Sequence, residues 1–296
     1  MKKFQVITDS TANIEKKYRD MVDLDYCRMH VAVNEKEYVA DLEWAEISAS
    51  DFYSAMRNNA KTTTTLVTVE EFENKFTKYL NQGLDVLYIA CSSKLSGSLN
   101  NAKIVASELQ EQYPDRKIIC FDSLRSNYAE GMMAACAANF ANQGKDIDEV
   151  VDYLNENRLK YQCHATVENL NWLKKAGRVK ASAAFFGNLI GIKPIILGDA
   201  RGNNFAHKKV KGRKNSLDDL VNTVIERIDS PSEAVLFIDH ADCIEDAIYV
   251  KNQIESKIQL KEINIQYLGP IIGSTVGPGA VVVNFYGKKV TIMGDE

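Results

Sequence analysis

The sequence predicts an α/β protein in two parts. We expect a parallel-sheet α/β N-terminal domain, followed by a second α/β sandwich domain with a mixed or antiparallel sheet. The chain has 296 residues, and a chain of that length usually divides into two cores. In its first half, short apolar runs alternate with helical segments, which indicates a parallel sheet with helices on both faces. In its second half, two apolar runs are joined by a short turn at Asp199–Gly202, which is typical of antiparallel neighbours.

The strands and helices of the first half are predicted from apolar runs and from a helix-capping motif. Phe4–Thr8, Asp85–Ala90 and Lys117–Phe121 are apolar runs of strand length. Thr68 and Glu71 have the spacing of a capping box, which predicts a helix that begins there and continues towards residue 83. Further helices are expected from Ser98 to about Gln112 and over Gly131–Phe140.

The polar, helical stretch near residues 144–161 is the expected boundary. It divides the chain into domains 1–158 and 159–296, and the second is expected to form much of an apolar pocket. Helices are predicted on one face of its sheet, and the glycine-rich stretch Gly269–Ala280 is predicted to be a turn. The expected strands are Cys163–Val167, Lys193–Leu197, Ala234–Ile238, Ile263–Tyr267 and Ala280–Tyr286, and the expected helices are Leu170–Lys175, Ser216–Ile228 and Ile244–Lys257.

Composition narrows the class of protein. Hydrophobic residues make up 45% of the chain and charged residues 26%, and the net charge is −4. That balance disfavours nucleic acid as the main partner. No apolar run approaches the ~18 residues of a membrane span, and the first residues lack the pattern of a signal peptide. The six cysteines form no CxxC pair. We therefore expect a cytoplasmic protein with reduced thiols and no integral membrane association.

Small polar residues gather where the predicted strands end. Asp9 and Ser10 follow one strand, Ser96 and Ser98 lie in the loop after another, and Asp122 follows a third. Ligands of open parallel sheets bind outside the carboxyl ends of the strands, and a helix start favours an anion. The alternative is that the serines and aspartates only cap helices and loops. The residues alone leave both interpretations open.

The sequence lacks several motifs of nucleotide-binding, hydrolase and zinc sites. The glycine-rich stretch lacks the GK[ST] ending of a phosphate loop, there is no GxSxG, and the histidines lack zinc-site spacing. Asp239, His240 and Asp242 could bind a metal, but a helix cap is the stronger interpretation. The basic run 207–214 (HKKVKGRK) is interpreted as an edge strand protected by lysines. Gly177 and the following arginine fit the end of a helix.

Two further stretches call for an explanation. Residues 61–68 read KTTTTLVT, and four adjacent threonines either tie down a turn or face a ligand that needs hydroxyl donors. Residues 183–192 read AAFFGNLIGI and have almost no polar content. They suit a core, and they equally suit the wall of a pocket for a long hydrocarbon chain.

Taken together, these segments resemble the DegV family of bacterial fatty-acid-binding proteins. The resemblance rests on ordered motifs along nearly the whole chain: ITDSTANI, TTLVTVEEF, SSKLSGSLNNA, FDSLRSNYAEG, LKKAGRVKASAAFFGNLIGIKPII, DHAD and GPIIGSTVGPGA. It implies a parallel-sheet domain plus a second α/β sandwich, with a fatty acid held between or beneath them. It also implies a lipid-binding protein without catalytic residues, metal or cofactor.

The resemblance also implies a set of binding residues. The family's carboxylate-binding hydroxyls fall on Thr64, with Thr65 beside it, and on Ser96, with Gly97 after it. The last motif places Gly273, Ser274 and Thr275 near the ligand, and Thr275 stands where the family usually has a histidine. The apolar stretch contributes Phe186, Leu189 and Ile190.

Partners and alternatives follow from the same resemblance. Some family members are the binding subunit of a fatty acid kinase and present the bound acid to a separate ATP-binding partner, so such a kinase is a candidate partner. The first alternative is a small-molecule enzyme, for phosphotransfer or hydrolysis, that uses Asp9 and Asp122. A regulatory interaction module is the second.

Overall fold

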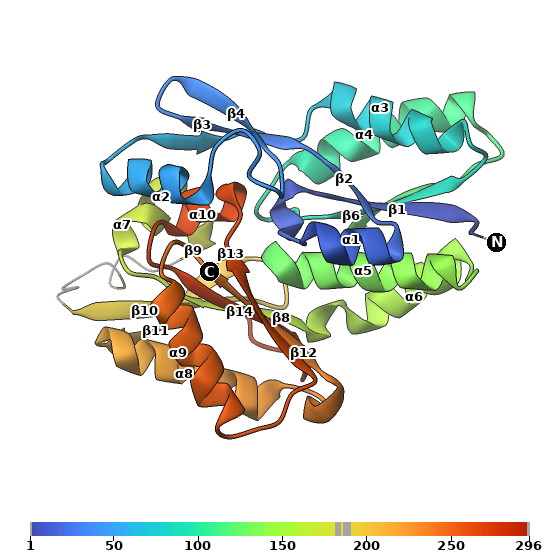
Figure 1. Cartoon of the computed structure of the whole chain (residues 1–296). Helices are drawn as coiled ribbons and strands as arrows, with labels where there is room; N and C mark the ends of the chain where they lie inside the picture. Colours follow the sequence, from blue (N-terminus) through green and yellow to red (C-terminus); the bar gives the residue numbers. More distant parts are fainter. Residues whose placement is uncertain (1, 181–184, 186–190, 295–296) are drawn as a thin grey trace.

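The computed structural model describes residues 2–180, 185 and 191–294, and its first sheet is parallel, as predicted (Figure 1). The strand order is β2-β1-β6-β7. Helices α3 and α4 cover one face of this sheet, and α1, α5 and α6 cover the other. The bounds are β1 Phe4–Asp9, β2 Asp25–Cys27, β6 Asp85–Ala90, β7 Ile118–Asp122, α1 Lys16–Val22, α3 Val69–Leu80, α4 Ser98–Gln112, α5 Asn127–Asn142 and α6 Ile147–Asn157, with the short 3-10 helix η1 at Ser10–Ala12.

A small antiparallel sheet lies beside the end of the first one. Its order is β4-β3-β5, with β3 Met29–Val33, β4 Lys36–Ala40 and β5 Thr62–Thr64. Helix α2, Ala49–Arg57, precedes β5 in the chain. Among the described strands, β5 pairs with β3 alone, so the threonine run forms a sheet edge. Sequence reasoning did not predict this third sheet, because its strands are only three to five residues long.

The second half forms one seven-stranded sheet in the order β13-β12-β14-β8-β10-β11-β9. The pairs β12–β13 and β11–β9 are parallel and the others antiparallel, which confirms the predicted mixed sheet. The bounds are β8 Tyr161–Thr166, β9 Val179–Lys180, β10 Ile192–Gly198, β11 Asn204–Lys211, β12 Val235–His240, β13 Glu262–Tyr267 and β14 Val281–Tyr286; its helices are α7 Leu170–Ala176, α8 Arg213–Arg227, α9 Ile244–Glu255 and α10 Pro270–Val276, with 3-10 turns at Arg158–Lys160 and Pro231–Glu233.

Local signals placed several helix ends correctly. The hydroxyl of Thr68 accepts from the backbone N–H of Glu71 at 3.1 Å, so α3 begins where the capping box predicts. The return bond of the box is absent, because the Glu71 carboxylate accepts from Arg28 N instead. Helix α7 ends at Gly177, whose φ of 65° is the left-handed geometry expected of a glycine cap.

Two predictions were wrong. The stretch 269–280, predicted as a turn, contains helix α10, which begins at Pro270 and ends before Gly277. Proline at the first helical position is favourable because its φ suits the helix and its missing N–H needs no partner there. The helices of the second sheet are not confined to one face either. Both α5 and α8 contact β8 and β14, so a helix from the first half covers the opposite face (Figure 1).

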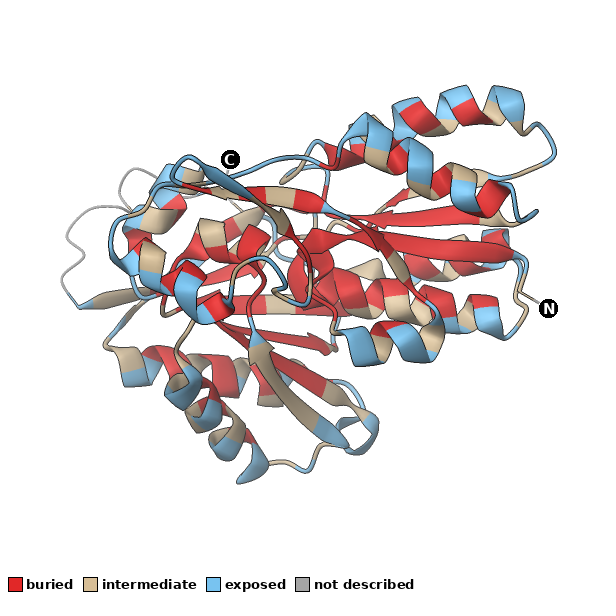
Figure 2. Cartoon of the chain, turned by 45° about the horizontal axis from the view of Figure 1, so that its top comes forward, coloured by how far each residue is buried: buried red, intermediate tan, exposed pale blue. Residues whose placement is uncertain are grey.

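Helix α5 therefore lies between the two sheets, and most of its residues are buried. Its inner positions are mostly alanine, including Ala134, Ala137 and Ala138, which are fully buried. Small side chains let the two sheets approach the helix closely. The burial colouring shows the same arrangement, with buried residues concentrated in both sheets and in the layer between them (Figure 2).

Polar contacts also join the two halves. The buried guanidinium of Arg125 donates to Tyr161 O at 2.7 Å and to Asp199 O at 2.9 Å. The hydroxyl of Ser92 donates to Gly202 O at 2.7 Å. Gly202 has a φ of 89°, and a Cβ there would lie 2.4 Å from the Ser92 oxygen. The turn after β10 thus packs directly on the loops at the carboxyl ends of β6 and β7.

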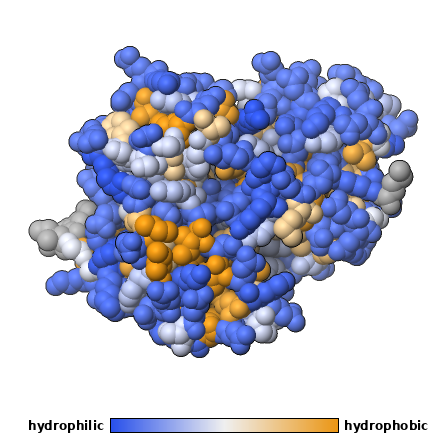
Figure 3. Space-filling view, viewed as in Figure 1, coloured by the Kyte–Doolittle hydropathy of each residue, from blue (hydrophilic) through white to orange (hydrophobic). Residues whose placement is uncertain are grey.

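The surface is mostly hydrophilic on the face shown in Figure 3, with apolar side chains gathered near α9. Ile244 and Ile248 of α9 are among the exposed large apolar residues. Within residues 2–180, 185 and 191–294, no helix has the length and apolar composition needed to cross a bilayer. All six cysteines are unpaired. Among the described residues, β11 pairs on its outer side with β9 at Asn204 and Phe205, and the lysine-protected edge at residues 207–214 stays a prediction.

Buried His164 gives the fold a defined pH dependence. Burial, with a smaller contribution from the Arg227 charge, lowers the pKa of its imidazole to about 3, whereas an unfolded histidine titrates near ~6.5. The unfolded state therefore takes up a proton first, and stability attributable to this group is lost as pH falls from about 6.5 to 3. As pH falls through that window, the unfolding free energy of the His164→Phe variant should rise relative to that of the wild type by up to ~1.4 kcal/mol per pH unit.

Denaturant unfolding of both proteins across this pH range checks the prediction. A difference in unfolding free energy that stays constant with pH would show that His164 keeps an ordinary pKa in the folded protein.

Candidate functional site

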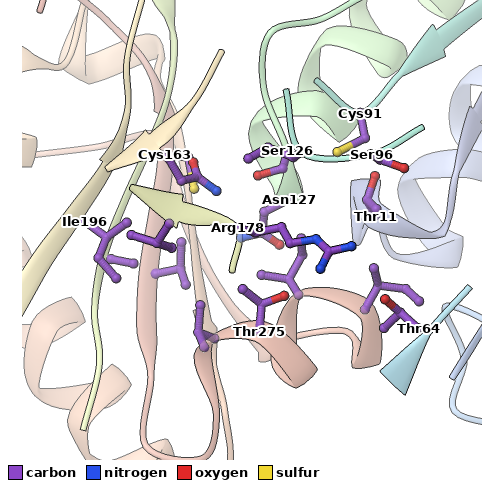
Figure 4. Close-up of a pocket in the computed structure, with 18 of the residues that line it drawn as sticks. Thr11, Thr64, Cys91, Ser96, Ser126, Asn127, Cys163, Arg178, Ile196 and Thr275 are labelled. Carbon is purple, nitrogen blue, oxygen red and sulfur yellow. The ribbon is translucent and has the colours of Figure 1, made fainter. Parts of the chain in front are cut away.

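A cavity, called the inner cavity below, lies where the two sheets and the small sheet meet (Figure 4). One wall comes from the first half of the chain, from η1, β5, the loop after β6 and the start of α5. The facing wall comes from β8, β10, β14 and α10. The apolar part of this second wall consists of Ala165, Ile196, Leu197, Ile271, Val276 and Val282. The first wall carries most of the polar groups, so the cavity has two chemically different sides.

The threonine run reaches the mouth of this cavity. Thr64 and Thr65 both line it and both are exposed. The Thr65 hydroxyl oxygen accepts from His30 N at 3.0 Å, whereas the Thr64 hydroxyl has no hydrogen-bond partner among the described residues. Thr64 therefore offers a free donor at the edge of β5. Its role as a carboxylate ligand stays a prediction.

Ser96 lines the inner cavity opposite β5 and is half-buried. Its oxygen accepts from Ser98 N at 3.2 Å, and its hydroxyl lies 3.0 Å from the Ser98 oxygen. That second oxygen accepts from Val67 N at 3.1 Å. Ser96 thus helps to cap α4, as the structural alternative expected, and it also faces the cavity. Gly97 is not a lining residue; a Cβ there would lie 3.1 Å from the Leu66 side chain.

The three residues predicted from the last motif take different places on α10. Thr275 lines the inner cavity, and its hydroxyl has no partner among the described residues. The Ser274 hydroxyl donates to Pro270 O at 2.8 Å and lies outside the inner cavity. Gly273 packs on Tyr53, whose hydroxyl oxygen would lie 2.3 Å from an added Cβ. Phe186, Leu189 and Ile190 lie outside the described residues.

Sequence reasoning missed Arg178 as a cavity residue. It was interpreted only as a cation after the glycine that ends α7. Its guanidinium donates to Ala176 O at 2.7 Å, and it points towards the side of the cavity where Thr11 and Thr64 lie (Figure 4). The described residues provide no carboxylate partner for it, so it is a cation available to an anionic ligand. Its place as the arginine of a family-like AGR motif was the only signal in the sequence.

A second space, called the outer chamber below, adjoins the mouth and has a volume of about 610 Å³. Thr64, Arg178 and Thr275 line both spaces. The outer chamber adds Lys61 and Lys175, and none of its lining residues in the described part of the chain is acidic. Cations that line one space without carboxylates make its potential positive, so the mouth of the inner cavity favours anions.

Beneath the cavity lies a buried pair of carboxyl groups, Asp9 and Glu130. The Thr11 hydroxyl oxygen lies 2.5 Å from Asp9 Oδ1 and 2.7 Å from Glu130 Oε2. A hydroxyl has one proton to donate, so one of these two short contacts needs a proton on the carboxyl. Burial, followed by the charge of Asp9, raises the pKa of Glu130 well above its usual range. Glu130 is therefore the protonated member and donates to Thr11, whose hydroxyl donates to Asp9.

In the structure, neither Asp9 nor Asp122, the two residues of the predicted enzyme alternative, has a free carboxylate. The Asp9 oxygens accept from Thr11 and from the Tyr88 hydroxyl, which lies at 2.6 Å. Asp122 accepts from Ser93 N, from the Ser93 hydroxyl and from Leu124 N. Both aspartates thus cap loops, which is the structural alternative that the sequence left open.

Asp239 and His240 end β12 and Asp242 follows it, and the described residues do not group them as a metal centre. Asp239 is fully buried and accepts from three side-chain amides, those of Asn127, Gln266 and Asn284. The described part of the chain contains no group of three or more histidine, cysteine or carboxylate side chains placed to hold a metal ion. Asp239 is instead the centre of a polar network that joins α5 to the second sheet.

The protonation of Glu130 leads to a prediction. Glutamine has the shape of a protonated glutamic acid, so Glu130→Gln should cost less than ~1 kcal/mol of unfolding free energy near neutral pH. Glu130→Ala should cost about 2–4 kcal/mol, because it leaves a void and unpaired hydroxyls. Above pH ~4.3 the carboxyl ionises in the unfolded wild type but stays protonated in the folded one, so the wild type loses unfolding free energy as pH rises. The glutamine variant has no such loss and should therefore become more stable relative to the wild type.

Denaturant titrations of the three proteins at two pH values measure these differences. Equal losses in the glutamine and alanine variants would mean that Glu130 is ionised in the folded protein.

Comparison with known proteins places the chain in a family. A family model described as "Uncharacterised protein, DegV family" matches residues 3–288. A DegV domain-containing protein of Clostridium perfringens is 36% identical over 97% of this chain and 98% of its own. A DegV lipid-binding protein of Thermotoga maritima has a TM-score of 0.84 at 26% identity, covering 98% and 100% of the two chains. DegV of Bacillus subtilis, described as a fatty-acid-binding protein, has a TM-score of 0.83 at 25% identity, covering 97% and 100%. This chain belongs to the DegV family.

Proposed function

We propose that this protein binds a long-chain fatty acid in the inner cavity and is not an enzyme. The carboxylate lies at the mouth, where the hydroxyls of Thr64 and Ser96 donate to it, and the chain lies against the apolar wall formed by β8, β10, β14 and α10. The observation that carries this proposal is the free Thr64 hydroxyl at the mouth of a two-sided cavity. The descriptions of the Thermotoga and Bacillus relatives support it.

The energies favour the tail as the source of affinity. A chain of ~16 carbons, at about 0.8 kcal/mol per buried CH₂, brings on the order of 12 kcal/mol of transfer free energy before the costs of association. Hydrogen bonds from two hydroxyls add about 1 kcal/mol each, and somewhat more when the acceptor is charged. The hydroxyls therefore orient the acid, and Arg178 supplies a charge that draws the carboxylate to the mouth.

The cavity must widen to take such a chain. Its volume is about 90 Å³, whereas sites for small ligands usually measure ~300–1,000 Å³. Helix α10 and strand β5 contact each other, and apolar residues that line the cavity lie on or beside them: Ile271 and Ile272 on α10, and Leu66 after β5. We propose that the ligand separates α10 from β5, so that binding and the packing of these residues are coupled.

Presentation of the acid to a kinase is the finer part of the proposal. The outer chamber supports it, because Lys61, Lys175 and Arg178 surround a space that begins where the carboxylate ends. A phosphate transferred to the carboxylate would lie among these cations, and a separate ATP-binding partner would supply it. A cytoplasmic location, where such a partner would be found, stays a prediction.

The first test is removal of the two hydroxyls. Thr64→Val and Ser96→Ala should each weaken fatty-acid binding by ~1–3 kcal/mol, because each leaves the carboxylate short of a donor. Direct titration of lipid-free protein measures the affinity, and thermal unfolding separates the effect of Ser96→Ala on the α4 cap.

Matched controls are Thr77→Val on α3 and Ser107→Ala on α4, neither of which lines the inner cavity. Unchanged affinity in both single variants at the mouth would place the carboxylate elsewhere.

The second test concerns Thr275. A histidine can donate from a ring nitrogen and carry charge near neutral pH, whereas threonine has one short neutral hydroxyl. We expect Thr275→His to raise kinase-dependent phosphorylation of the bound acid more than it raises affinity. Turnover with a cognate kinase and affinity are compared in the two proteins. Robust turnover by the threonine protein, without improvement by histidine, would contradict the proposed role of this position.

A further inference from the structure

The serine at the start of α5 does not form the capping hydrogen bond that is usual for serine at that position. Ser126 occupies the N-cap position, where its hydroxyl would ordinarily accept from a backbone N–H of the first turn. It makes no such bond, and it has no hydrogen-bond partner among the described residues. The side chain is only 5% exposed and lines the inner cavity. Ser126 is therefore a buried hydroxyl left free inside the inner cavity.

The next residue also leaves a polar atom unused. Asn127 has a φ of 58°, a left-handed conformation that asparagine tolerates better than most residues. It is 1% exposed, lines the same cavity, and its Oδ1 has no hydrogen-bond partner. An unpaired buried acceptor costs ~1–3 kcal/mol, so the site gains when a ligand supplies a donor.

The orientation of this amide is fixed by its neighbours. Asn127 Nδ2 donates to Asp239 Oδ2 at 2.6 Å and lies 3.4 Å from Asn284 Oδ1. A flipped amide would bring its oxygen against both of these oxygens, since Asn284 Nδ2 already donates to Asp239. The unused atom of this amide is therefore an acceptor and not a donor.

These atoms lie in the interior of the cavity and not at its mouth. In Figure 4, Ser126 and Asn127 lie between Thr64 on one side and Ile196 on the other. Thr64 is exposed, whereas both α5 residues are buried. Asn204 of β11, half-buried in the cavity wall, also has a side chain without a hydrogen-bond partner among the described residues. Plain hydrocarbon would leave all three unpaired.

We propose that the inner cavity selects long-chain acids that carry a hydroxyl group on the chain, with that hydroxyl donating to Asn127 Oδ1 and accepting from Ser126. A hydroxyl is the small group that both donates and accepts. A keto oxygen would satisfy Ser126 but would meet the Asn127 oxygen without a proton between them. A carboxylate at this point would face the same acceptor and be repelled. The inference rests on the proposed function and names the class of acid that the same site prefers.

The test compares stearic acid with a series of stearic acids that carry one hydroxyl at successive positions along the chain. Lipid-free wild-type protein should bind at least one positional isomer about tenfold more tightly than stearic acid, as two added hydrogen bonds offset by desolvation of the hydroxyl allow. In the Ser126→Ala variant, the ratio of the affinity for that isomer to the affinity for stearic acid should be close to one, and the affinity for stearic acid should be unchanged. Ser126→Thr, which keeps the hydroxyl, should retain the tighter binding of that isomer.

Ser274→Ala is the matched control, because that hydroxyl donates to Pro270 O outside the inner cavity. Thermal unfolding confirms that each variant is folded.

Each contrary outcome has a distinct meaning. If stearic acid binds and no isomer binds more tightly, the inference is overturned and the proposed function stands. If Ser126→Ala weakens stearic acid and the preferred isomer equally, Ser126 holds the carboxylate and the inference is again wrong. If neither stearic acid nor any isomer binds, the proposed function fails together with the inference.

Discussion

The buried contacts at the start of α5 are the constraint on which the rest of the structure depends. Helix α5 is placed between the two sheets, and its first residues are tied to the second sheet by the bond from Asn127 to Asp239. Arg125, just before the helix, reaches the backbone of Tyr161 and Asp199. On the other side, a Cβ at Gly131 would lie 2.5 Å from Ala12 O, so α5 also contacts η1 directly. These contacts fix the spacing of the two walls between which the inner cavity lies.

The same region explains why polar residues are concentrated around a site for an apolar ligand. Thr11, at the floor of the cavity, is held between Asp9 and a protonated Glu130. The floor therefore carries one negative charge fewer than its sequence implies, which reduces repulsion of a bound carboxylate. The cations are placed at the mouth instead, on elements from both halves of the chain. In the proposed complex, charge and hydrocarbon are thus recognised at opposite ends of one space.

Much of the fold could be predicted from local signals. The alternation of strands and helices, the Thr68 cap of α3 and the Gly177 end of α7 each depend on residues close together in sequence. The prediction failed where tertiary contacts decide. Helix α10 is short and glycine-rich, and its packing on Tyr53 is not visible in its own sequence. The two-sided burial of α5 depends on strands that come later in the chain.

The site divides in the same way. Family motifs brought attention to Thr64 and Ser96, and the structure places both on the inner cavity. The run of threonines now has a structural account: it forms the edge strand β5, whose residues line the mouth and the outer chamber. Ser126, Asn127 and Glu130 could not be recognised from sequence, because a buried polar residue has meaning only through partners such as Asp239 or Thr11. Arg178 was visible but was explained by its neighbouring glycine.

The most direct test of the central claim, that an acyl chain occupies the space between the two sheets, is the content of the protein as it leaves the cell. Protein purified from a bacterial host without added lipid is extracted with organic solvent, and the extract is quantified by mass spectrometry. The account predicts close to one long-chain fatty acid per chain, and a lower amount from a variant in which Ala165 of the apolar wall is replaced by tryptophan while the fold is retained. Full occupancy in that variant, or no fatty acid from the wild type together with no binding of added acid, would contradict it.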